Sequence, residues 1–92
     1  MTNMDTFICN PSLQQFYTYA PVALSAGKPV ILGYVKPTGR THYVLITALY
    51  GNGTDLSQYG CIDPYDGTYK NLVTVAGGRP LYRMAIYKRG LH

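Results

Sequence analysis

The chain has 92 residues, of which 47% are hydrophobic and only 13% are charged. These values exclude a disordered chain, which needs low hydrophobicity and high charge, and the length suits one small domain. Eight Lys and Arg against four Asp and no Glu give a net charge of +4, and the ten Tyr and ten Gly favour strands and turns over helices.

The first predicted element is a helical segment over residues 10–27, which follows a lead-in over residues 1–9. Asn10 and Pro11 are typical of a helix start, since Asn caps free N–H groups and Pro suits the first helical position. Apolar residues then recur at helical spacing, and a glycine stands where the helix should end. Pro21 lies inside the segment and predicts a kink or a split into two short helices.

The remaining residues, 28–92, are predicted to form a sheet of about five strands. Apolar runs alternate there with short turns that contain Pro, Gly and Asn. The predicted strands cover residues 30–35, 42–50, 58–63, 69–75 and 81–87. We therefore expect an α+β fold in a single domain, with a short N-terminal helical segment packed on one face of a mostly antiparallel sheet.

His42 and Asp63 are the residues whose placement most strongly suggests chemistry. His42 opens the second predicted strand and Asp63 closes the third. If these strands are antiparallel neighbours, both residues lie at one end of the sheet and the carboxylate reaches the imidazole. Such an Asp orients a His that accepts a proton, which is the base half of a nucleophilic triad. A structural His at a strand edge and a plain Asp-Pro turn are the alternatives.

Three short segments resemble the C-terminal half of papain-like cysteine peptidases of the C39, bacteriocin-processing, type. They are residues 27–31 (GKPVI), 41–47 (THYVLIT) and 62–69 (IDPYDGTY). The resemblance implies a truncated papain-like fold in which His42 is the catalytic base and Asp63 orients it. That family places its nucleophilic Cys on a helical lobe well upstream of the His, whereas only 41 residues precede His42 here.

Cys9 is the candidate nucleophile upstream of His42. It comes just before the predicted helix start, where the helix dipole would lower the pKa of a thiol. Phe7 and Ile8 precede it, which is typical of a buried structural cysteine. Cys61 is expected to be inert, and a disulfide between the two cysteines stays open. The Cys, His and Asp residues show no metal-ligand spacing, so we expect neither a metal nor a cofactor.

The tyrosines exceed what a small core can bury, and the basic residues gather toward the C-terminus. Because Tyr and Arg are enriched at protein interfaces, these residues predict a binding surface. The candidate binding residues are Tyr65, Tyr82, Arg83, Lys88 and Arg89. An edge strand guarded by charge is the alternative interpretation. The sequence carries no nucleic-acid motif, so we do not expect nucleic-acid binding, and a homodimer stays open.

Together these features predict a non-catalytic C39-like module that binds another protein. By size analogy the module would be a small inhibitor that occludes its partner, such as a phage anti-defence protein of the anti-CRISPR kind. The alternative is a minimal cysteine peptidase or acyl-transfer enzyme that uses Cys9, His42 and Asp63. With no apolar run long enough for a membrane span, no secretory signal and few cysteines, we expect a cytoplasmic protein without a membrane partner.

Overall fold

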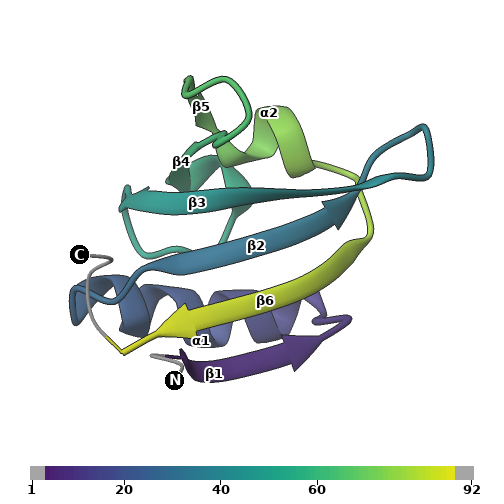
Figure 1. The fold of residues 1–92 in the computed structure, drawn as a ribbon. Helices are drawn as coiled ribbons and strands as arrows, with labels where there is room; N and C mark the ends of the chain where they lie inside the picture. Colours follow the sequence, from purple (N-terminus) through teal and green to yellow (C-terminus); the bar gives the residue numbers. More distant parts are fainter. Residues whose placement is uncertain (1–3, 89–92) are drawn as a thin grey trace.

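A computed structural model describes residues 4–88 and shows six antiparallel strands with helix α1 packed on one face of the sheet (Figure 1). The strands are β1 (Met4–Cys9), β2 (Val30–Val35), β3 (Thr41–Leu49), β4 (Tyr59–Ile62), β5 (Tyr69–Asn71) and β6 (Leu81–Tyr87). The helices are α1 (Leu13–Ser25) and α2 (Leu72–Ala76), with a 3-10 turn η1 (Leu56–Gln58). The predicted α+β class is confirmed.

The order of strands across the sheet is β1-β6-β2-β3-β4-β5. Strands β2 to β5 form an antiparallel meander, in keeping with the expected antiparallel sheet, and β6 then returns to lie between β1 and β2. The lead-in predicted over residues 1–9 is wrong for its described part, because residues 4–9 form edge strand β1 against β6. This pairing joins segments more than 70 residues apart in the sequence. Local sequence patterns do not predict contacts between residues so far apart.

Helix α1 begins at Leu13 because Ser12, and not Asn10, is its cap. The Gln15 N–H donates to the Ser12 hydroxyl at 3.1 Å, and the Ser12 N–H donates to the Gln15 side chain at 3.0 Å. This reciprocal capping box satisfies two free N–H groups. Asn10 instead adopts a left-handed backbone with φ of 51°, which Asn tolerates better than most residues. The helix continues through Pro21, so the predicted split into two helices is wrong.

The strand predicted over residues 69–75 ends at Asn71. The Val73 N–H donates to the Asn71 side chain at 3.0 Å, and this cap starts helix α2. Leu72 and Ala76, four residues apart, then both point into the core. The β-branched residues of this segment favour a strand locally, but packing over η1 and β4 selects a helix.

The core lies between the helices and one face of the sheet, which we call the inner face. Its largest fully buried side chains are Phe16, Val30, Leu32, Val44, Ile46, Tyr59, Cys61, Leu72 and Met84. On the opposite, outer face, no helix or strand of residues 4–88 covers the sheet, as the uncovered front of the sheet in Figure 1 shows. In the same part of the chain, no helix is long and apolar enough to cross a membrane.

Candidate functional site

The predicted contact between His42 and Asp63 is present in the structure. Strands β3 and β4 pair with Leu45 opposite Ile62, so the start of β3 and the end of β4 meet at one end of the sheet. His42 Nε2 lies 2.9 Å from Asp63 Oδ1 and 3.0 Å from Oδ2. The two side chains are only 18% and 11% exposed. Tyr34 packs edge-on against the imidazole, with 5.7 Å between ring centroids, and limits its rotation.

The Asp63 carboxylate is held by the backbone as well as by the imidazole. The Tyr65 N–H donates to Oδ1 at 2.9 Å. Burial raises the pKa of Asp63. The hydrogen bonds from the Tyr65 N–H and from His42, together with a charge on His42, lower this pKa by a larger amount. The net result is a pKa below the ordinary value, so Asp63 is ionised at neutral pH.

This geometry assigns different roles to the two imidazole nitrogens. An ionised carboxylate only accepts hydrogen bonds, so Nε2 of His42 must carry a proton. In the neutral ring, Nδ1 then holds the lone pair. Nδ1 makes no hydrogen bond within residues 4–88, and no buried side-chain nitrogen there lacks a partner, so Nδ1 faces solvent. The pair is therefore built to accept a proton at Nδ1.

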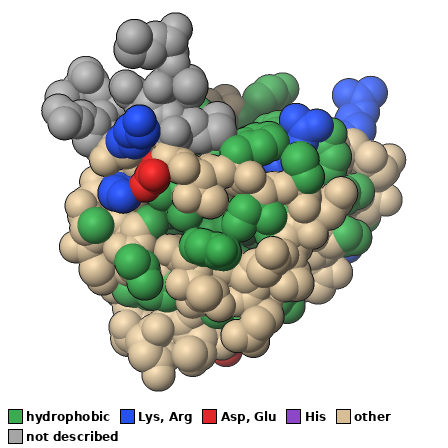
Figure 2. Space-filling model, turned by 90° about the horizontal axis from the view of Figure 1, so that it is seen from below, with side chains coloured by type: hydrophobic (Ala, Val, Ile, Leu, Met, Phe, Trp, Pro, Cys, Tyr) green, Lys and Arg blue, Asp and Glu red, His purple; other side chains and the backbone are tan. Residues whose placement is uncertain are grey.

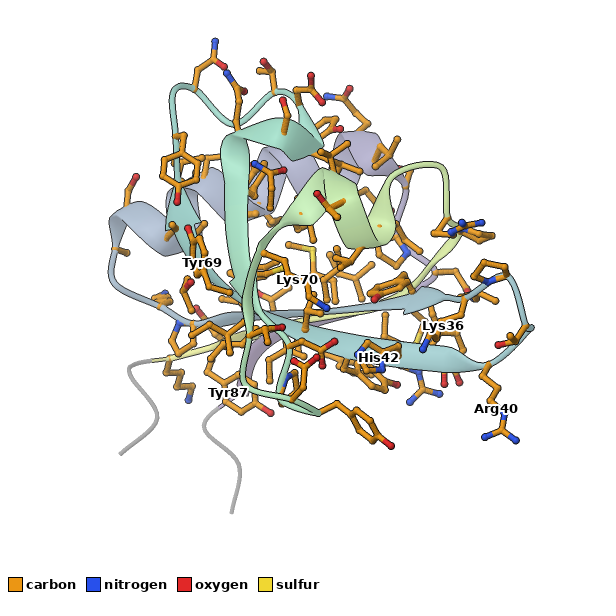
Figure 3. All side chains as sticks on the ribbon, turned by 90° about the horizontal axis from the view of Figure 1, so that it is seen from above. Lys36, Arg40, His42, Tyr69, Lys70 and Tyr87 are labelled. Carbon is orange, nitrogen blue, oxygen red and sulfur yellow. The ribbon has the colours of Figure 1, made fainter. Side chains whose placement is uncertain are left out.

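Two shallow hollows adjoin His42, and both include the ring of Tyr65. One, of about 340 Å³, is lined by Thr41, His42, Tyr43, Pro64 and Tyr65. The other, of about 270 Å³, is also lined by Thr41, His42 and Tyr65, and Lys36 and Arg40 complete its wall. The Tyr65 side chain is 90% exposed and stands edge-on to the imidazole, with 6.4 Å between the ring centroids. Figure 3 shows Lys36, Arg40 and His42 at this end of the sheet.

Cys9 does not join this pair, although it lies at the same end of the sheet as His42. One row of opposed residues crosses four neighbouring strands. In spatial order it contains Cys9 of β1, Arg83 of β6, Gly33 of β2 and Tyr43 of β3. Three strand spacings therefore separate Cys9 from β3, a distance of about 14 Å. The row that contains Cys9 points to the outer face, whereas His42 points to the inner face. A triad of Cys9, His42 and Asp63 is not assembled.

Cys61 is closer to the pair, but its thiol is not available as a nucleophile. It lies in β4, fully buried in the core. Burial, and to a smaller extent the charge of Asp63, raises the pKa of the Cys61 thiol to about 11. The thiol is therefore protonated and shielded at neutral pH. Both cysteines are free, and they occupy opposite faces of strands that are not neighbours, so the disulfide left open by the sequence does not form.

The predicted binding residues do not form a single patch. Tyr65 stands beside the imidazole. Tyr82 and Arg83 lie on the outer face, where the Arg83 guanidinium carbon is 4.7 Å from the centroid of the Tyr82 ring. Lys88 is exposed just beyond β6, at the end of the sheet opposite the His42–Asp63 pair. Arg89 lies outside the described residues.

The structure reveals a surface that the sequence analysis missed, an apolar row across the outer face. It takes one side chain from each strand, namely Phe7, Ala85, Ile31, Leu45, Ile62 and Tyr69 in spatial order. Phe7 and Tyr69 at its ends are 48% and 54% exposed. The signal in the sequence was the nearly continuous apolar run over residues 30–35, which indicates that both faces of that strand are apolar.

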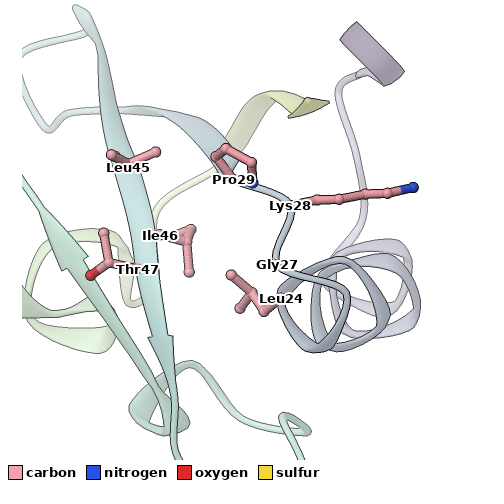
Figure 4. Close-up of a pocket in the computed structure, with 7 residues that line it drawn as sticks. All are labelled: Leu24, Gly27, Lys28, Pro29, Leu45, Ile46 and Thr47. Atoms are coloured by element: carbon pink, nitrogen blue, oxygen red, sulfur yellow. The ribbon is translucent and has the colours of Figure 1, made fainter. Parts of the chain in front are cut away.

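Two further hollows lie away from the His42–Asp63 pair. One, of about 240 Å³, lies between the end of α1 and β3 and is lined by Leu24, Pro29 and Ile46 among others (Figure 4). The second, of about 310 Å³, lies between α1 and the β1–β6 pair, on the side of the molecule where Figure 2 shows hydrophobic side chains gathered. Lys28 lines both hollows, but its Nζ is paired with Asp5 at 2.5 Å.

Comparison with known proteins adds no assignment, since no family model, curated protein or solved structure matches the chain. The relationship to C39-type peptidases therefore stays a prediction that rests on the sequence motifs. Among residues 4–88, no three His, Cys, Asp or Glu side chains are grouped so that they could hold a metal ion.

Proposed function

We propose that the chain is a C39-like protein-binding module that keeps a His–Asp pair without a working nucleophile, and that the outer face of the sheet binds its partner. The observation that carries the proposal is the apolar row, which runs across all six strands with no layer of residues 4–88 over it. Its end residues Phe7 and Tyr69 are exposed, Ile31, Leu45 and Ile62 are half-buried, and Ala85 is buried. Apolar side chains that stay accessible on an uncovered sheet face mark interaction sites, and their burial drives association.

The position of the cysteines supports a binding function over the alternative enzyme. The pair of His42 and Asp63 supplies a base and the residue that orients it. Attack on a substrate also needs a thiolate in hydrogen-bond reach of the base. Cys9 is about 14 Å away by strand spacing, and Cys61 is buried with a raised pKa. A cysteine peptidase built only from the described residues has no reactive thiol within reach of His42.

The charge of the outer face defines the partner that fits it. The guanidinium of Arg83 stands among aromatic rings beside the apolar row, 5.7 Å from the centroid of Phe7. The apolar row contains no acidic side chain. Covering Arg83 without a carboxylate would be costly, because a desolvated charge needs a partner. A second copy of the same face would bring a second Arg83, so the fitting occupant is an apolar segment of another protein that carries Asp or Glu.

The narrower prediction, an inhibitor of the phage anti-defence kind, rests on chain length by analogy. Occlusion by such an inhibitor would use this same face.

Site-specific photocrosslinking tests the proposal. A benzophenone amino acid replaces Phe7 on the outer face or, as a control, Tyr19, which is 43% exposed on helix α1. In cells that produce the full chain, position 7 should crosslink to one protein of different mass, through a peptide that contains apolar and acidic residues. Adding Leu45→Lys should abolish this product, whereas Val22→Lys on the exposed side of α1 should not.

Three outcomes would overturn the proposal. A product of twice the mass of the chain would identify a second copy as the occupant. Equal crosslinking from positions 7 and 19, or none from position 7, would show that the outer face is not a specific binding surface. Circular dichroism of each variant separates loss of binding from loss of fold.

A further inference from the structure

The turn between β2 and β3 brings two cations to the face of the sheet that holds His42. The Lys36 N–H donates to the Arg40 carbonyl at 2.7 Å, so these two residues stand directly opposite each other. Opposed residues of an antiparallel pair point to the same face, and faces alternate along each strand. The pair Tyr34–His42 lies two positions further along the same ladder. Lys36, Arg40 and His42 therefore share the inner face.

These three side chains line one hollow, which we call the hairpin hollow. It has a volume of about 270 Å³ and is completed by Thr41 and Tyr65. Nδ1 of His42 is the solvent-facing nitrogen of the ring, and His42 is part of the hollow's wall. The hollow thus combines two cations, one imidazole and the flat ring of Tyr65.

The cations of the hairpin hollow lack a counter-charge. Within residues 4–88, neither Lys36 nor Arg40 has a carboxylate oxygen within 4.0 Å. The neighbouring carboxylate of Asp63 is already engaged, since His42 and the Tyr65 N–H occupy its oxygens. With the His42 ring neutral, two cations beside one carboxylate leave a single net positive charge.

We propose that the hairpin hollow binds one carboxylate group of a peptide, either a C-terminal carboxylate or an Asp or Glu side chain. The planar guanidinium of Arg40 offers paired N–H donors that match a carboxylate, and Lys36 adds a second charge. The single net charge matches a carboxylate better than a dianionic phosphate. The Tyr65 ring offers an apolar wall to the residue that carries the carboxylate. This site lies on the inner face, so it does not rest on the proposed use of the outer face.

A titration followed by NMR of the His42 ring tests the proposal with three peptides. The first is acetyl-tetra-alanine with a free C-terminus, the second is its C-terminal amide, and the third is an amide of the same length with one Asp. At least one of the two carboxylate peptides should shift the His42 signals saturably at concentrations up to about 10 mM, and the neutral amide should not. A response to the first peptide identifies a chain terminus as the ligand, and a response to the third identifies an acidic side chain.

Charge-matched variants make the test specific. Arg40→Gln and Lys36→Gln should each weaken binding about three- to tenfold. Lys88→Gln removes the same charge at the opposite end of the sheet and should leave the affinity unchanged. Equal weakening by all three variants, equal binding of the neutral amide, or no shift with any peptide would overturn the proposal. Tighter binding of inorganic phosphate than of either carboxylate peptide would also overturn it. None of these results depends on the crosslinking outcome at Phe7.

Discussion

Replacing Asp63 by Asn tests whether the His–Asp pair is a stabilising ionic contact. Asn keeps the size of the side chain and one oxygen for the Tyr65 N–H, but it loses the charge and one acceptor for Nε2 of His42. A hydrogen bond to a charged group contributes about 1.5–3 kcal/mol. We therefore expect the free energy of unfolding at pH 7 to fall by about 2 kcal/mol. For a domain of this size, that corresponds to a decrease in Tm of about 8–16 °C.

The pH dependence of this loss follows from the direction of the pKa shift. Asp63 has a lower pKa in the folded state than in the unfolded chain, where it is about 3.9. Its ionised form therefore stabilises the fold fully above the unfolded pKa, and this contribution is lost as the pH falls through the folded pKa. The difference in stability between the wild type and Asp63→Asn should be largest at neutral pH and shrink below about pH 4.

Urea unfolding followed by circular dichroism at pH 7 and pH 3 measures both effects. Asp55→Asn is the matched control, because it removes one negative charge while Asn can still cap the 3-10 turn at Ser57. An equal loss of stability in the two variants at pH 7 would refute the reasoning. So would a deficit of Asp63→Asn that is as large at pH 3 as at pH 7.

Two further predictions concern the cysteines and the outer face. Iodoacetamide should label Cys9 in the folded protein, whereas Cys61, with its pKa raised to about 11 by burial, should react only after denaturation. Mass spectrometry of the labelled protein checks this. Labelling of Cys61 in native protein at the rate of Cys9 would contradict it. Gly33→Ala should destabilise the fold by about 1 kcal/mol or more, because its Cβ would lie 2.6 Å from the Tyr43 ring. Unfolding of the double variant with Tyr43→Ala should show this cost relieved, and an unchanged cost would contradict the contact.

The His–Asp pair could be predicted from sequence because its geometry follows from one local feature. His42 and Asp63 stand at the ends of two consecutive strands, and a short connection makes consecutive strands antiparallel neighbours. The position of Cys9 could not be predicted in the same way. Its distance from His42 depends on β6, which inserts between β1 and β2 from the far end of the chain.

The sequence by itself determined the α+β class, strands β2, β3 and β6, and the end of the sheet where His42 and Asp63 meet. These features depend on hydrophobic periodicity, turn residues and short connections, which are local. Tertiary structure alone decided that residues 4–9 form β1 and that residues 72–76 form α2. It also decided which face each strand leaves uncovered. Burial selects among conformations that local preference leaves close in energy, and so the apolar row and the separation of Cys9 from His42 appear only when the sheet is assembled.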